Sequence, residues 1–154
     1  MLSLVAALQH LQSYVLGCGA AALAMGLMVA AKGLVTQTEA GLSASQGLPV
    51  MVFVSLMAFF PILFFALPAF LIISFLHLVR TAPTLLTSGV VWALNAAFVV
   101  AAMAHTGGHL VGPNSHGRLQ SIVVCGIAGA VGGVVAWLSL AKAQVEISSR
   151  KEVQ

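Results

Sequence analysis

Histidine is the residue type in this sequence best suited to binding a metal ion. His105 and His109 are four residues apart and would share one helix face if the helix continued that far. His116 follows in the same polar segment, and imidazoles so placed bind zinc or copper. Gly107 and Gly108 weaken a helix there, and no Cys, Asp or Glu stands nearby. We therefore favour interfacial histidines over a metal site at His105, His109 and His116.

A b-type haem is a second chemistry that these residues allow, because haem iron takes axial histidine ligands. His10 and His77 fall near one predicted side of the membrane, and His105 and His109 fall near the other. The distribution keeps open a membrane redox anchor that holds haem b or a quinone. However, all four histidines lie at the ends of predicted helices or in a loop, so this function remains the alternative.

Asn95 is the polar residue nearest the centre of a predicted membrane helix. Polar groups at that depth are expensive in free energy and need a partner. We expect the Asn95 amide to bond a neighbouring helix. The alternative is that Asn95 lines the path of a small oligomeric channel or transporter. No acidic or basic residue lies at mid-depth, which disfavours proton-coupled transport.

The composition excludes a soluble globular enzyme. The chain has 154 residues, of which 60% are hydrophobic and 6% are charged, whereas about 25% of an average soluble domain is charged. The net charge of +3 is scattered along the chain, so there is no clustered basic surface for nucleic acid. Asp is absent and Glu is scarce, which argues against phosphoryl transfer with magnesium.

Four apolar stretches are long enough to span a bilayer as helices, which need about 20 apolar residues each. They cover residues 11–35, 48–79, 83–104 and 119–141, and a polar tail covers 144–154. The sequence therefore predicts an all-α fold: a single transmembrane domain, residues 1–154, built as a four-helix bundle.

The second stretch, 48–79, is too long for one crossing, since it corresponds to about 48 Å of helix. It contains Pro61 and Pro68, each of which removes a backbone donor and bends a helix. We expect a long, proline-kinked helix whose first turns, 48–55, lie along the interface, or a helix broken in two. Seven of the eight Phe residues fall in this stretch and predict a surface that faces lipid or a partner.

Small residues recur at four-residue spacing in the first and last stretches. Ala22, Gly26 and Ala30 form one such series, and Gly129 and Gly133 form a GxxxG pair. Because this spacing lets two helix backbones approach closely, we expect both stretches to pack tightly on each other or on another subunit.

The distribution of Lys and Arg predicts the orientation. Four crossings place both termini on one side. That side carries Arg80, Lys142, Arg150 and Lys151, and the other carries Lys32 and Arg118. Both termini are therefore expected on the cytoplasmic, matrix or stromal side of a bacterial or organelle inner membrane. Tyr14 and Trp137 are read as aromatic anchors at that interface, and Lys32 as a residue that extends to the headgroups.

These features together favour a non-catalytic, multi-pass subunit that packs within a larger membrane complex. The expected partners are membrane lipids, some of them bound, and other membrane subunits in a hetero- or homo-oligomer. No cofactor is assigned, and no nucleic-acid partner is expected.

Overall fold

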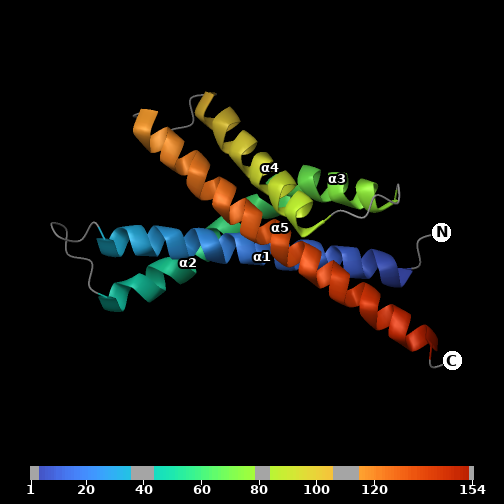
Figure 1. The fold of residues 1–154 in the computed structure, drawn as a ribbon. Helices are drawn as coiled ribbons and strands as arrows, with labels where there is room; N and C mark the ends of the chain where they lie inside the picture. The colour runs from blue at the N-terminus through green and yellow to red at the C-terminus, as the bar shows by residue number, and fades with distance from the viewer. Residues whose placement is uncertain (1–3, 36–43, 79–83, 106–114, 153–154) are drawn as a thin grey trace.

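The computed structural model describes residues 4–35, 44–78, 84–105 and 115–152, with side chains described for 8–32, 47–76, 84–103 and 119–142. These ranges form helices and no strand. The helices are α1 (Leu4–Val35), α2 (Ala44–Phe65), α3 (Leu67–Leu78), α4 (Leu85–His105) and α5 (Ser115–Glu152) (Figure 1).

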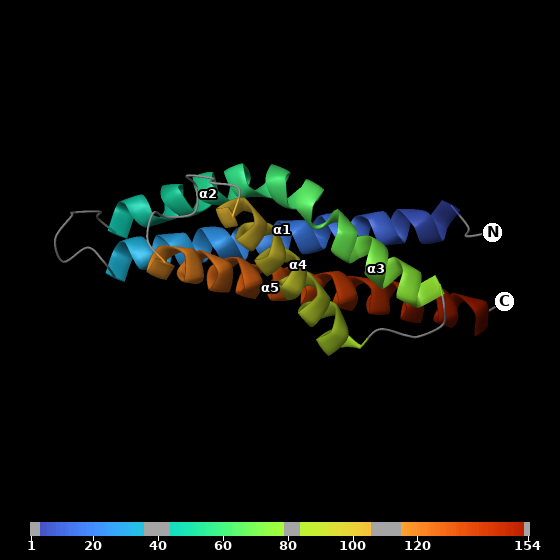
Figure 2. The ribbon, with the colours of Figure 1, turned by 90° about the horizontal axis from the view of Figure 1, so that it is seen from above.

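Four helices are long and apolar enough to cross a membrane, which confirms the predicted all-α membrane fold. The candidate spans are Leu8–Lys32, Gly47–Phe65, Leu85–Met103 and Leu119–Lys142. The first turn of α1 and the last turn of α5 lie at the same end of the bundle (Figure 2). α5 is the longest helix and continues through the polar segment to Glu152, so that segment is helical rather than an irregular tail.

The overlong second stretch is divided at Ala66 into α2 and α3. Pro68 has no N–H with which to bond the carbonyl of Phe64, four residues earlier. Hydrogen bonds from Ala66 N to Ile62 O (2.8 Å) and from Phe70 N to Ala66 O (3.0 Å) carry the chain across the break. Gly47–Phe65 is by itself long enough to cross a membrane. The part of the stretch 48–79 that exceeds one crossing is therefore α3, at its C-terminal end. The expected interfacial segment 48–55 thus lies inside the span-length helix.

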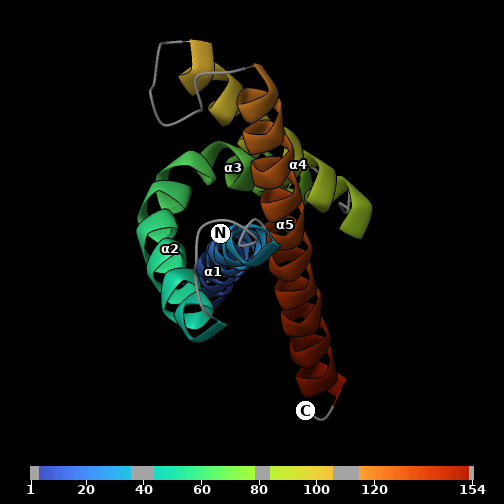
Figure 3. The same cartoon turned by 90° about the vertical axis from the view of Figure 1, so that its left-hand side faces the viewer.

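α1 occupies the middle of the bundle, with α2 on one side and α5 on the other (Figure 3). α5 also packs along α4, and α3 contacts α4. α2 and α4 scarcely touch each other. The packing order α2–α1–α5–α4 therefore leaves a seam between α2 and α4.

α1 and α5 cross where two glycines face each other. A Cβ placed on Gly17 would lie 2.8 Å from the Gly132 carbonyl oxygen, and one on Gly132 would lie 2.7 Å from the Gly17 carbonyl oxygen. Both distances are too short for a real Cβ. The absence of side chains at both positions therefore sets how closely the two helices approach.

The glycines chosen from the sequence face other helices. A Cβ on Gly129 would lie 2.7 Å from the Trp92 carbonyl oxygen of α4, and one on Gly133 would lie 2.6 Å from the Ser88 carbonyl oxygen. Gly133 also accepts a hydrogen bond from Ser88 Oγ, 2.9 Å long. Gly26 lies against Met51 and Ser55 of α2.

The core lies where the α2–α3 break meets α1, α4 and α5. Its buried members are Tyr14, Cys18, Ala66, Ala69, Ile73, Trp92 and Ala136. The outward face of α2 is exposed, including Phe53 (63%), Phe60 (64%) and Phe64 (75%). In a membrane this face meets lipid or another protein.

The contact between Gly17 and Gly132 predicts that a single methyl group destabilises the fold. We expect Gly132→Ala to lower the free energy of unfolding by about 1–3 kcal/mol, the usual effect of overpacking. Denaturation in mixed micelles, followed by circular dichroism, measures this change.

Gly19→Ala on α1 is the matched control, because a Cβ there meets nothing within 4 Å. It should cause no loss of stability. Equal losses in the two variants would contradict the close α1–α5 approach.

Candidate functional site

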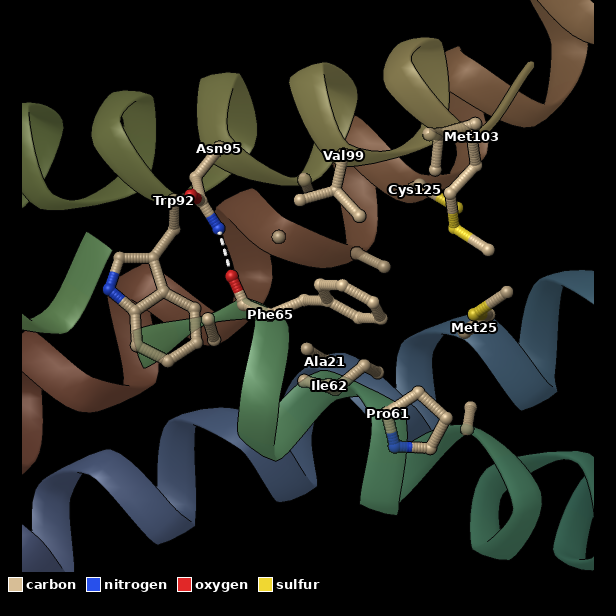
Figure 4. A pocket seen from close by; sticks show the side chains of 16 residues that line it. Ala21, Met25, Pro61, Ile62, Phe65, Trp92, Asn95, Val99, Met103 and Cys125 are labelled. Atoms are coloured by element: carbon tan, nitrogen blue, oxygen red, sulfur yellow. Dashed lines mark hydrogen bonds between the residues drawn. The ribbon is translucent and has the colours of Figure 1, made fainter. Parts of the chain in front are cut away.

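A cavity of about 270 Å³ lies in the seam between α2 and α4, with α1 and α5 beneath it (Figure 4). Sixteen residues line it, and nearly all are apolar: Ala21, Met25, Ala58, Pro61, Ile62, Phe65, Ala66, Trp92, Asn95, Ala96, Val99, Val100, Met103, Cys125, Ala128 and Gly129. The Asn95 amide is its most polar lining group. The cavity is partly open on its outer side.

Asn95 bonds the end of α2. Its amide nitrogen, Nδ2, donates to the Phe65 carbonyl oxygen at 2.6 Å (Figure 4). The sequence led us to expect a bond to a neighbouring helix, and Phe65, the last residue of α2, supplies the acceptor. Neighbouring side chains commonly satisfy backbone groups near a proline break in a membrane helix.

Tyr14, from α1, bonds the same turn of α2. Its hydroxyl donates to the Leu63 carbonyl oxygen, and its ring packs against Phe70 with centroids 4.7 Å apart. Tyr14 is only 6% exposed. The interpretation of Tyr14 as an interfacial anchor was wrong, because α1 begins at Leu4 and so carries Tyr14 deeper into the bundle than a start near residue 11 would.

The two cysteines are free thiols: Cys18 is buried and Cys125 is partly buried. Cys18 belongs to the core, whereas Cys125 lines the cavity. Both positions are those of apolar packing residues.

The structure does not bring the candidate histidines together into a described site. The ring of His10 packs edge-on against Phe70 of α3, with centroids 6.5 Å apart. His77 lies on α3, His105 is the last residue of α4 and His116 follows the first residue of α5, and only their backbone is described. His109 lies outside the described residues.

The predicted metal and haem sites consequently fall largely outside the described side chains. Within the part of the chain that the structure describes, no group of three His, Cys, Asp or Glu could hold a metal ion. The cavity lining contains no histidine. The cavity is therefore apolar apart from the Asn95 amide, whose nitrogen bonds Phe65.

Comparison with protein-family models, curated proteins and solved structures found no match. The function must therefore be inferred from the geometry of the bundle and its cavity.

Sequence reasoning missed the cavity and the residues that frame it, chiefly Met25, Trp92 and Val99. Each has the side chain of an ordinary core residue, so composition gives no signal. A signal did exist in the combination of Pro68, Tyr14 and Asn95. Two polar donors within apolar helices, together with a proline that frees a carbonyl nearby, point to bonds at that break.

The two bonds at the break predict a measurable contribution to stability. We expect Asn95→Leu and Tyr14→Phe each to lower the free energy of unfolding by about 0.6–1.7 kcal/mol, the range for hydrogen bonds between membrane helices. The measurement is unfolding in mixed micelles.

Ser74→Ala is the control, since Ser74 Oγ is buried and has no hydrogen-bond partner among the described residues. It should leave stability unchanged or slightly higher. Asn95→Leu and Tyr14→Phe behaving like Ser74→Ala would show that the bonds at the break do not stabilise the bundle.

Proposed function

We propose that this chain is a non-catalytic, multi-pass membrane subunit that packs within a larger membrane assembly. The observation that carries the proposal is the use made of its interior polar groups. Tyr14, Ser88 and Asn95 each donate to a backbone carbonyl oxygen of another helix. These groups hold helices together, and their arrangement is that of a scaffold rather than of a reaction centre.

A face of α2 offers a surface for a neighbouring subunit. We call it the α2 outer face, and it comprises Phe53, Leu56, Met57, Phe60 and Phe64, all more than half exposed. The spacing of three and four residues places these side chains along one side of the helix. Large apolar knobs in that pattern suit the grooves of another membrane helix.

The cavity supports this proposal over ion transport. An ion that sheds its hydration shell needs carbonyl or charged groups to replace it. The lining supplies one amide, Asn95, whose nitrogen already bonds Phe65. Close packing of α4 against α5 also supports the proposal. Gly129 of α5 lies against Trp92 of α4, and Gly133 lies against Ser88, so the two helices form a rigid pair.

The proposal includes the location inferred from charge. The chain resides in a bacterial or organelle inner membrane, with its termini on the cytoplasmic, matrix or stromal side. The excess of Lys and Arg on that side supports this orientation.

Truncation of one aromatic residue on the α2 outer face tests the proposal. We expect Phe64→Ala to reduce the amount of copurifying membrane subunits roughly ten-fold, which corresponds to about 1.4 kcal/mol at the contact. Affinity purification from native membranes in mild detergent, followed by quantitative mass spectrometry, measures the loss.

Phe98→Ala on α4 is a matched control, because Phe98 is 74% exposed and Phe64 is 75% exposed. Both variants remove the same side chain from a membrane-spanning helix. If no subunit copurifies with the unmodified chain, or if Phe64→Ala and Phe98→Ala retain equal amounts, the α2 outer face is not the docking surface.

A further inference from the structure

The cavity runs beside α4, which lines it from Trp92 to Met103, whereas α1 contributes only Ala21 and Met25. Trp92, Asn95 and Phe65 surround one end, and Met25, Met103 and Cys125 surround the other (Figure 4). Every lining residue except Ala66 belongs to a helix segment long enough to cross a membrane. In a membrane the cavity therefore lies within the hydrocarbon layer.

The lining chemistry selects an apolar occupant. An apolar cavity of about 150 Å³ stays dry and takes up benzene, and this one, at about 270 Å³, is larger. Its Ala, Val, Ile, Met and Phe side chains give water none of the two to four polar partners that it needs. In a membrane, the apolar group present at highest concentration is the acyl chain of a phospholipid.

A cation stands beyond one end of the cavity. Lys32 follows Met25 by seven residues and Ala21 by eleven on α1, and this spacing puts all three on one face of the helix. At 1.5 Å per residue, Lys32 lies about 10 Å beyond Met25 along the axis. Its ammonium is exposed and donates to Gln120 Oε1 of α5 at 3.0 Å.

We propose that the seam is a phospholipid-binding site. One acyl chain occupies the cavity from Met25 and Met103 inward to Asn95 and Trp92, and the lipid phosphate pairs with Lys32. The positions agree, because Lys32 lies at the end of the α1 span, where a headgroup would sit. The nearest end of the cavity, at Met25, is about 10 Å away along the helix axis.

Trp92 provides a direct reporter, because its ring lines the inner end of the cavity but is only 3% exposed. The chain has two tryptophans, so Trp137→Phe leaves Trp92 as the single fluorophore. The full chain in detergent is titrated with a phospholipid whose acyl chains carry bromine at mid-chain. Bromine quenches indole fluorescence on contact, and we expect saturable quenching of Trp92.

Val99→Phe fills the cavity and should reduce the maximal quenching several-fold. Val90→Phe is its control on the same helix, since Val90 is exposed and lies outside the cavity, and it should quench as the parent does. Ala58→Leu on the opposite wall serves as a second filling variant if Val99→Phe disturbs folding, which circular dichroism checks. Lys32→Gln should raise the half-quenching lipid concentration by about five-fold at low ionic strength, as expected of an exposed ion pair.

Three results would overturn the proposal. Absence of saturable quenching, or equal quenching in Val99→Phe and Val90→Phe, would show that no acyl chain occupies the cavity. Equal half-quenching concentrations for the parent and for Lys32→Gln would show that Lys32 does not contact the lipid phosphate. Quenching of Trp92 by an isoprenoid quinone, with no effect of brominated lipid, would assign the cavity to a redox ligand instead.

Discussion

Close contact between backbones is the interaction on which the rest of this bundle depends. Inside a bilayer, burying one apolar helix against another gains little hydrophobic free energy, so packing must supply the attraction. Gly17 and Gly132 bring α1 and α5 together until a Cβ on either residue would lie 2.7–2.8 Å from the carbonyl oxygen of the other. Gly129 and Gly133 do the same between α5 and α4. These contacts fix three helices as one rigid unit.

α2 joins that unit through α1 alone along most of its length, and this attachment creates the molecule's two distinctive surfaces. Toward α4 it leaves the seam and its cavity. Away from the bundle it leaves the α2 outer face. Beyond the proline break α3 contacts α4, while Asn95 of α4 and Tyr14 of α1 both bond the last turn of α2. The bond from Asn95 to Phe65 lies at one end of the cavity (Figure 4).

Hydropathy alone predicted the number of membrane helices, because satisfying backbone groups in lipid leaves few structures to choose from. It could not predict partners. Periodicity shows that Gly129 and Gly133 share a face, but not that the face meets α4 while Gly132 meets α1. Two prolines predicted a break, yet the helix continues through Pro61 and is interrupted at Ala66, beside Pro68. The sequence placed Tyr14 at the membrane interface because the first helix was expected to begin near residue 11, whereas α1 begins at Leu4. The cavity exists because α2 and α4 scarcely touch. No local sequence pattern predicts which pairs of helices will be in contact.

The central claim is that this chain exists to pack among other membrane proteins. The most direct test is the mass and composition of the native particle extracted in mild detergent. We expect a particle far heavier than the 15.8 kDa of the chain, with other polypeptides present in fixed ratio to it. A stable, homogeneous particle that contains one copy of this chain and only lipid would contradict the claim.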